Sequence, residues 1–280
     1  MFTIVIALVA SAGWGVSDFW GGLVARRVPV FVLILISQTL GMVAIGVILV
    51  ISGDSFPGIG EVWQVSVTTP LAIIGLAAFY RAMATGTMSI VAPISATGVA
   101  VPVIFGVATG DQLQALQLIG IVAAACGAGL AGMEASEDNE QSRKARKAIA
   151  LSAFAAICLG INYVGVDASA DASVWWALFT GRGMELLMVA GIVVVTGASL
   201  RLSRNDMRTV VGVGVFEVVG GVCFALATTS GLLSVASVLS ALYPITVVVL
   251  ARVVIGERVR AIQAVGIAVT MAGVILIAAG

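Results

Sequence analysis

The chain has 280 residues, of which 60% are hydrophobic and 10% are charged, and its formal net charge is zero. A soluble domain carries roughly 25% charged residues, so this composition, with a mean hydropathy of +1.16, excludes a soluble globular enzyme. The balanced charge gives no support for nucleic-acid binding, because the basic residues lie in short segments between apolar runs.

Apolar runs of membrane-spanning length recur along the whole chain. A helix needs about 20 residues to cross about 30 Å of hydrocarbon, and ten runs come close to that length. In chain order, we expect helices over residues 2–23, 30–51, 67–86, 90–109, 115–132, 148–168, 173–198, 209–229, 234–254 and 261–279. The sequence therefore predicts an all-α membrane protein with ten transmembrane helices.

One long polar link divides the chain into two halves of five predicted helices each. A shift of 145 positions aligns identical residues of the two halves, so that Gly15 meets Gly160 and Phe79 meets Phe224. A fixed offset of this kind indicates an internal duplication. We expect a first five-helix repeat over 1–133, a charged cytoplasmic linker over 134–147, and a second five-helix repeat over 148–280.

The odd number of helices in each half has a consequence for topology. The second repeat must enter the membrane from the opposite side, which makes the two repeats inverted. Inverted repeats are a common plan of secondary carriers, with the binding site between the repeats near the membrane midplane. The basic residues gather in the segments after the first, fifth, seventh and ninth helices. The positive-inside rule then puts these loops in the cytoplasm and both termini outside.

Ionisable residues within apolar helices are costly, so each is a candidate for function. The set is Asp18, Arg81, Arg182, Glu185 and Glu217. Asp18 and Arg81 lie at similar depths and can meet, while Arg182 and Glu185 are three residues apart and can pair locally. Glu217 has no neutralising neighbour in its own helix, which makes it the preferred site for coupling to a proton or cation. The alternative is that these groups form structural ion pairs, with Arg182 satisfying Glu217.

The first predicted helix also carries a stripe of small residues. Ser11, Gly15, Asp18 and Gly22 share one helix face, and Trp14 lies beside them. Small residues let neighbouring helices approach closely and leave room for a cavity. Together with the carboxylate, the stripe indicates a helix that lines a polar cleft.

The fourth and ninth predicted helices are counterparts in the two repeats, and both contain proline within the span: Pro93 and Pro102 in one, Pro244 in the other. Proline frees a backbone carbonyl and kinks a helix. Paired interrupted helices are a sequence pointer to a transport site, and ordinary tolerance of proline in membrane helices is the alternative.

Signals for enzymatic chemistry are missing from the sequence. There is no histidine, and Cys126, Cys158 and Cys223 are far apart in separate apolar runs. No HExxH, GxSxG or Walker motif occurs. We therefore expect no enzyme, no metal and no cofactor, and any uphill transport must use a gradient or exchange.

Three stretches resemble a known family: WGVSDFWGGLVARR (14–27), FYRAMATGTMSIVAPI (79–94) and GERVRAIQAVGIAVTMAGVILI (256–277). They are similar to the EamA-type carriers of the drug/metabolite transporter superfamily, and the resemblance covers nearly the whole chain. It implies a ten-helix inverted-repeat carrier in the cell membrane that moves amino acids, other metabolites or drugs, often outward. The central cavity that it implies would lie near Trp14, Asp18, Arg81, Asn162, Tyr163, Glu217 and Tyr243.

These observations together predict a secondary active transporter of small metabolites that works by alternating access. Proton coupling through Asp18 or Glu217 is a hypothesis, and a passive facilitator or channel is the alternative function. The expected partners are a small-molecule substrate, protons and the lipid bilayer, but no nucleic acid, and the protein is expected as a monomer or homodimer. Many relatives keep both termini in the cytoplasm, whereas the basic loops here argue for the reverse.

Overall fold

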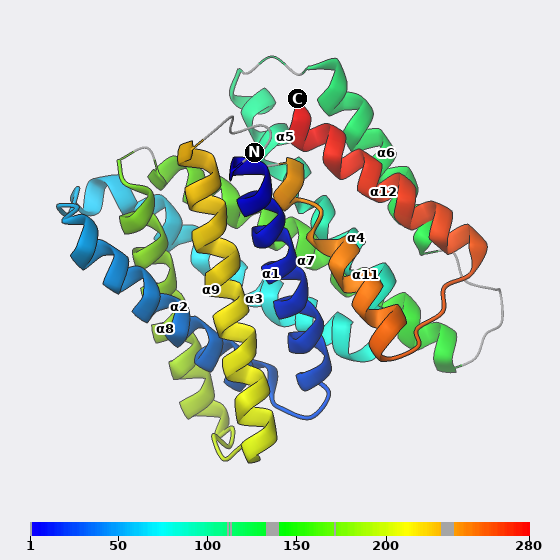
Figure 1. The fold of residues 1–280 in the computed structure, drawn as a ribbon, viewed down its shortest axis with the longest axis horizontal. Helices are drawn as coiled ribbons and strands as arrows, with labels where there is room; N and C mark the ends of the chain where they lie inside the picture. The colour runs from blue at the N-terminus through cyan, green and yellow to red at the C-terminus, as the bar shows by residue number, and fades with distance from the viewer. Residues whose placement is uncertain (1, 111, 113, 133–139, 171, 231–237) are drawn as a thin grey trace.

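Helices dominate the computed structural model, which describes residues 2–110, 112, 114–132, 140–170, 172–230 and 238–280 (Figure 1). Within these residues there is no strand. Eight helical segments are long and apolar enough to cross a membrane, and two shorter apolar helices, Ala115–Ala131 and Val238–Val254, bring the described set to ten. The predicted all-α, multi-pass membrane fold is confirmed.

The helices agree closely with the predicted spans and are labelled as in Figure 1. They are α1 (Phe2–Val24), α2 (Val30–Ser52), α3 (Ile59–Thr85), α4 (Met88–Ala96), the 3-10 turn η1 (Thr97–Val99), α5 (Ala100–Thr109), α6 (Ala115–Ala131), α7 (Glu140–Ala170), α8 (Val174–Thr196), α9 (Arg204–Ser230), α11 (Tyr243–Val254) and α12 (Ala261–Ala279).

Three helices begin several residues earlier than expected: α3, α7, and α9, which begins at Arg204 where 209 was expected. The first turns of α3 carry Glu61 and Gln64, and α7 begins in the charged segment at Glu140, so hydropathy alone misses both beginnings. Residues 140–147 of the expected linker are therefore helical, which corrects that part of the prediction. The rest of the linker, 134–139, and the beginning of the ninth predicted helix, 234–237, lie outside the described residues.

The two halves make the same close contacts with the partner helices exchanged. A Cβ at Gly15 on α1 would meet the Tyr243 carbonyl oxygen of α11 at 2.6 Å. A Cβ at Gly160 on α7 would meet the Gly98 carbonyl oxygen of η1 at 2.5 Å. Both members of one contact lie 145 positions from the members of the other, as the sequence offset requires. The exact repeat boundaries stay a prediction.

Helices of opposite halves pair throughout the bundle: α1 with α9, α3 with α7, α2 with α8, and α6 with α12. Figure 1 shows α6 and α12 side by side at one edge of the molecule. Gly120, Gly127, Gly266 and Gly273 line this contact, which we call the glycine seam. A Cβ at Gly273 would meet the Gly120 carbonyl oxygen at 2.6 Å, so the two backbones touch directly.

The fourth and ninth spans are both interrupted near their middle. The fourth breaks at η1, between α4 and α5, and the ninth has a turn at 241–242 before α11. Pro102 lies in the first turn of α5 and Pro244 in the first turn of α11, where a missing N–H is tolerated. These two prolines therefore mark places where a helix begins again, while Pro93 lies inside the continuous helix α4.

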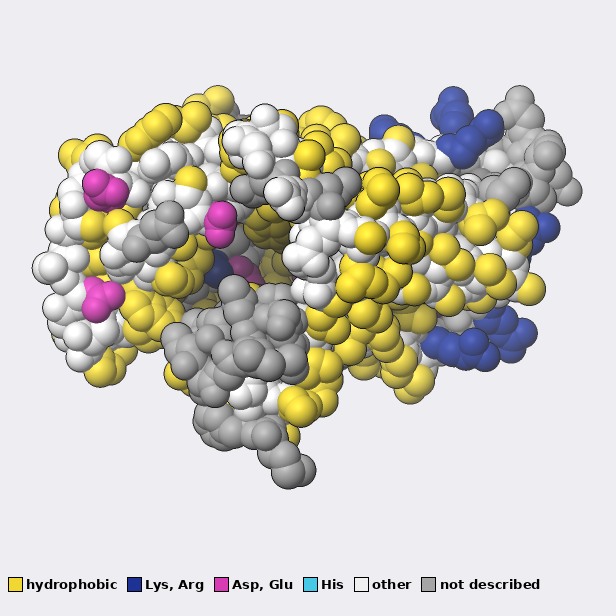
Figure 2. Space-filling view, turned by 90° about the horizontal axis from the view of Figure 1, so that it is seen from above, with side chains coloured by type: hydrophobic (Ala, Val, Ile, Leu, Met, Phe, Trp, Pro, Cys, Tyr) yellow, Lys and Arg dark blue, Asp and Glu magenta, His cyan; other side chains and the backbone are white. Residues whose placement is uncertain are grey.

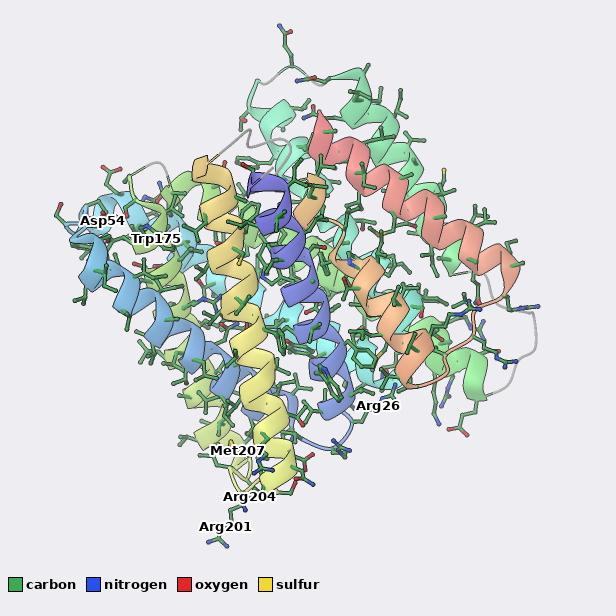
Figure 3. The ribbon with its side chains drawn as sticks, in the orientation of Figure 1. Arg26, Asp54, Trp175, Arg201, Arg204 and Met207 are labelled. Carbon is green, nitrogen blue, oxygen red and sulfur yellow. The ribbon has the colours of Figure 1, made fainter. Side chains whose placement is uncertain are left out.

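The two ends of the bundle differ in charge and in packing. Arg26, Arg201 and Arg204 lie toward one end, the basic end, and Asp54 and Trp175 lie toward the other (Figure 3). Both termini lie at this second end, the terminal end (Figure 1). Every residue of α4, in the half of its span nearer the basic end, is buried, whereas α5, in the other half, has no buried residue. Along this span the packing is therefore tight toward the basic end and loose toward the terminal end.

A carboxylate joins the two halves at the basic end. Glu257, in the loop between α11 and α12, accepts hydrogen bonds from the backbone N–H groups of Met88 and Ser89, each at 2.8 Å. It also accepts one from the Ser89 hydroxyl at 2.6 Å. The carboxylate thus satisfies free N–H groups at the N-terminus of α4, where the helix dipole favours negative charge.

Candidate functional site

Small residues bring α1 against α9 and so place two carboxylates in one region. A Cβ at Gly13 would lie 3.0 Å from the Phe216 carbonyl oxygen, and one at Gly220 would lie 2.7 Å from the Trp14 indole nitrogen. The Trp14 ring also packs against Phe224 with ring centroids 5.5 Å apart. The glycine that lets α1 approach α9 is Gly13, outside the predicted stripe, whereas Gly15 of the stripe meets α11.

Asp18 lies beside the aromatic side of the site. It is half-buried, and it lies within electrostatic range of Tyr163 from α7, Tyr243 from α11 and Glu217 from α9. Among the described residues no basic side chain forms an ion pair with Asp18. The carboxylate is therefore available to a ligand, and the tyrosine rings beside it suit the apolar part of an organic cation.

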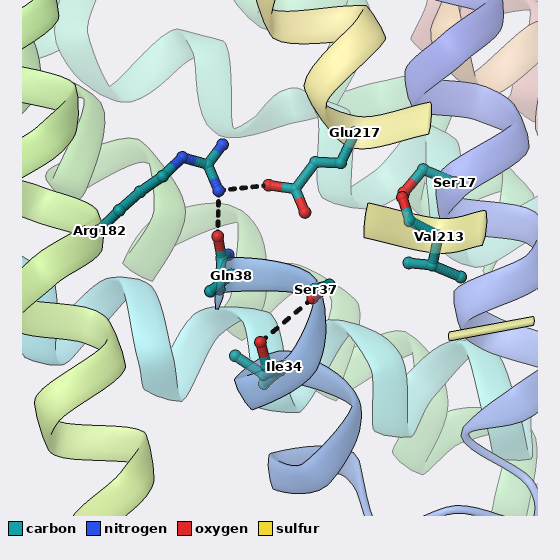
Figure 4. A network of polar contacts seen from close by, with 7 residues as sticks. All are labelled: Ser17, Ile34, Ser37, Gln38, Arg182, Val213 and Glu217. Carbon is teal, nitrogen blue, oxygen red and sulfur yellow. Dashed lines mark hydrogen bonds and ion pairs between the residues drawn. The ribbon is translucent and has the colours of Figure 1, made fainter. Parts of the chain in front are cut away.

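Arg182 from α8 occupies the other side of the site (Figure 4). Its Nη1 donates to Glu217 Oε1 at 2.9 Å and also to Gln38 Oε1 of α2. A Cβ at Gly41 would meet the guanidinium, 2.8 Å from Cζ, so glycine at this position lets the group lie against α2. The Nε of Arg182 is buried and has no hydrogen-bond partner within the described part of the chain.

The ion pair differs from the local pair that the sequence suggested. Arg182 pairs with Glu217 and not with Glu185. The expected local pair of Arg182 and Glu185 is therefore wrong, and the alternative, in which Arg182 pairs with Glu217, is confirmed. The Arg182 side chain extends toward α2 and α9, away from its own helical neighbour. Glu185 is 8% exposed and lies within electrostatic range of both partners.

The expected meeting of Asp18 and Arg81 is wrong. Arg81 is exposed, and no ion pair joins it to Asp18 in the described residues. Equal depth does not fix the direction in which a side chain points. The preceding residue, Tyr80, packs against Gly21 of α1, and one residue further the helix has turned by about 100°.

Asn162 has a local partner. Its amide donates to the Thr68 hydroxyl of α3 at 3.2 Å. The residue 145 positions earlier, Ser17, donates to the Val213 carbonyl oxygen of α9 at 2.9 Å, and Thr68 and Val213 are related by the same offset. Asn162 therefore serves the packing of α7 on α3, as Ser17 serves the packing of α1 on α9.

Three contributors were not among the predicted site residues: Ser17, Gln38 and Tyr80. All three are buried, and Tyr80 lies within electrostatic range of Asp18, Glu185 and Glu217. The cost of a charge in a membrane selects Asp, Glu and Arg, and the family resemblance selects other positions, so neither criterion selects these three residues. Gln38 alone left a clear signal, since it is a polar residue in the middle of an apolar span.

The site lies below a hollow that opens at one end of the bundle. Figure 2 shows the molecule from the terminal end, where the surface is hollowed and basic and acidic side chains are visible in its depth. A large buried apolar cluster that includes Phe19, Met83 and Met88 fills the bundle toward the basic end. Buried apolar side chains therefore lie on the side of the site toward the basic end.

A second depression lies between α2 and α8. It has a volume of about 290 Å³ and is lined by Thr39, Met42, Val43, Gly46, Phe179 and Leu186. Its lining surface is wholly apolar, so it offers nothing to orient a polar ligand. The region around Asp18 and Arg182 is the better candidate.

Metal chemistry has no visible basis in the site. The described residues contain no group of three His, Cys, Asp or Glu side chains able to hold a metal ion. Within the part of the chain that the structure describes, the arrangement instead offers two carboxylates outside any ion pair, Asp18 and Glu185, one ion pair, and several aromatic rings.

Comparisons with known proteins agree with this arrangement. Residues 146–279 match the EamA-like transporter family, which confirms the resemblance seen in the sequence. No curated protein matches the chain by sequence. One crystal structure, described only as that of a protein, is similar over 96% of this chain and 95% of its own, with a TM-score of 0.62 and 13% identity. At that identity the likeness shows a shared fold alone.

Proposed function

Because residues 146–279 match the EamA-like transporter family, we propose that the protein is a secondary carrier of amphoteric small metabolites in the drug/metabolite transporter superfamily. Amino acids and related compounds are the substrate class that the site suits best. The basic end would face the cytoplasm, and export would be the direction of net transport. We propose the cytoplasmic membrane as the location and a monomer or homodimer as the working form.

One observation carries this proposal: the site has separate places for a cation and an anion. Asp18 lacks an ion-pair partner among the described residues and lies beside Tyr163 and Tyr243, which suits the ammonium group of a ligand. Arg182 has a buried Nε without a partner in the described structure, which suits a carboxylate. A zwitterion would therefore satisfy groups from α1 and α8 at once.

Alternating access would use the interrupted helices and the one-sided opening. In the described state the ligand would leave at the terminal end, and rearrangement of the repeats would open the site at the basic end for the next ligand. Proton coupling is proposed at Asp18 or Glu217, since a carboxylate in a water-accessible hollow can exchange a proton as the ligand leaves. No step needs a cofactor.

The test is uptake of an amino-acid and metabolite panel into proteoliposomes, with and without an imposed pH gradient. Accumulation driven by the gradient is expected for at least one amphoteric class. Equilibration that ignores the gradient would identify a passive facilitator instead.

Asp18→Asn is the matching variant, because it keeps the size of the side chain and removes its charge. We expect folded protein without transport. Asp167→Asn makes the same change at an exposed carboxylate of α7 and should transport normally. Normal transport by Asp18→Asn would contradict the proposed role.

A further inference from the structure

One contact breaks the repeat symmetry of the bundle. Near the basic end α1 packs against α3, with Gly21 against the ring of Tyr80 and Gly22 against Met83. The counterpart helices α7 and α9 make no contact of similar extent in the described residues. Two inverted repeats in the same conformation would make both contacts, so the bundle is closed at one end and not at the other.

The residues themselves explain why the two ends differ. Shifted by 145 positions, Gly21 corresponds to Val166 and Tyr80 corresponds to Ala225. A ring can lie on a glycine, and a Cβ at Gly21 would sit only 3.0 Å from Tyr80 Cζ and 3.1 Å from its hydroxyl oxygen. The pair Val166 and Ala225 has no ring to supply, so an equivalent aromatic seal cannot form from these two positions.

Tyr80 lies between the ligand site and the apolar cluster at the basic end. Its side chain is 3% exposed, it belongs to the same buried cluster as Phe19 and Met83, and its hydroxyl interacts with Ser17. Its electrostatic neighbours are Asp18, Glu185 and Glu217. It is thus the side chain at which the polar hollow ends and the apolar packing begins.

We propose that Tyr80 is the gate of the pathway at the basic end, and that its ring must leave Gly21 for a ligand to pass. This proposal rests on the carrier function proposed above. Asp18, which would hold the ammonium group of the ligand, is within electrostatic range of Tyr80, so a charge bound at Asp18 changes the surroundings of the gate residue. Ligand binding and opening of the basic end are therefore linked through one side chain.

Hydrogen–deuterium exchange in lipid nanodiscs tests the gate without any substrate. The readout is the exchange rate of the α1 backbone amides over residues 17–24, which become exposed to water when the basic end opens. Tyr80→Ala should accelerate this exchange about tenfold or more, because local opening sets the rate. Tyr80→Phe keeps the ring and should exchange like the wild type. Gly21→Ala, which displaces the ring without removing it, should exchange faster than the wild type.

Phe79→Ala is the matched control for lost packing. Phe79 is the neighbouring residue, is 4% exposed, and belongs to the same buried cluster. If Phe79→Ala accelerates exchange at residues 17–24 as much as Tyr80→Ala does, the gate is overturned, since any cavity would then have the same effect. If Tyr80→Ala and Gly21→Ala both exchange like the wild type, the gate is overturned as well.

Transport separates the gate from the carrier function. In proteoliposomes Tyr80→Ala should convert gradient-driven accumulation of the substrate into equilibration, because a carrier that is open at both ends leaks. Tyr80→Phe should still accumulate the substrate. Full accumulation by Tyr80→Ala would overturn the gate and leave the carrier function standing. Absence of transport by the wild type for the whole panel would reject the carrier function, and hydrogen exchange would still decide whether Tyr80 seals the basic end.

Discussion

Replacing Gly41 with alanine should displace Arg182 from the site while leaving the bundle folded. A Cβ at this position would lie 2.5 Å from Arg182 Nη1 and 2.8 Å from Cζ. Non-bonded atoms settle near 3.5 Å, so the guanidinium must move by about 1 Å. The atoms that clash are the far end of a flexible side chain, and alanine favours a helix over glycine, so the fold can absorb the change.

The displacement has a definite consequence for binding. Nη1 donates to Glu217 at 2.9 Å, and a shift of about 1 Å carries it beyond hydrogen-bonding distance. A hydrogen bond to a charged group contributes about 1.5–3 kcal/mol. Losing one such bond between Arg182 and a ligand carboxylate corresponds to about a 10- to 100-fold weaker affinity. The apparent KM for the transported amphoteric compound should rise by that factor.

The same helix supplies the control. Gly46→Ala adds the same methyl group to α2, and its nearest contact would be Phe179 at 3.4 Å, an ordinary van der Waals distance. Both variants should unfold at similar temperatures in detergent, and only Gly41→Ala should show the raised KM in proteoliposomes. Equal transport by the two variants would refute the reasoning that Gly41 positions Arg182.

Three further predictions concern the ion pair, the glycine seam and the joint at the basic end. Glu217→Gln should lower the free energy of unfolding by about 1–3 kcal/mol, because it leaves the Arg182 charge without its partner. Adding Arg182→Gln should restore the unfolding temperature but not transport. A double variant as unstable as Glu217→Gln alone would contradict this account. Gly273→Ala should destabilise the bundle by about 1–3 kcal/mol, because its Cβ would clash with backbone that cannot move aside. Gly129→Ala, whose Cβ meets no atom within 4 Å, should unfold like the wild type. Equal unfolding temperatures for the two variants would contradict the close packing of the glycine seam. Glu257→Gln should lower the stability by about 0.5–2 kcal/mol through weaker capping of α4; an unchanged thermal midpoint in detergent would show that the carboxylate does not hold this joint.

Most of the fold was predictable because the membrane imposes a simple rule on the sequence. A helix that crosses hydrocarbon must be apolar over a known length, and this rule located α1, α2 and α12 to within a residue or so of their bounds. The rule fails where a helix extends past the hydrocarbon. Glu61 and Gln64 in α3 and the charged residues after Glu140 in α7 look like loop in a hydropathy profile, although they are helical.

The site was predictable in its members but not in its pairings. The cost of an ionisable group in a membrane singled out Asp18, Arg182 and Glu217, and the structure brings these three into one region. Which of them pair depends on the rotation of each helix about its axis, and a count of depth along the span does not contain that angle. Arg81 shows the limit, since it was expected to meet Asp18 and is exposed instead.

Repeat symmetry was visible in the sequence, whereas the departure from it was not. The offset that relates Gly15 to Gly160 says that both halves have one fold. It does not say that both halves adopt one conformation, because that depends on side chains that differ between the repeats. Gly21 and Tyr80 are in contact, whereas the residues at the corresponding positions of the second repeat are a valine and an alanine.

The glycine seam has a consequence for how the protein is assembled in the cell. α6 ends at Ala131 and its partner α12 begins at Ala261. α12 therefore emerges from the ribosome only after α7, α8, α9 and α11 have been made. During that interval the small-residue face of α6 borders lipid or the insertion machinery, with no backbone to rest against. Closure of the seam is therefore a late step of biogenesis, and a substitution there should show itself first as slow maturation and degradation of the newly inserted chain.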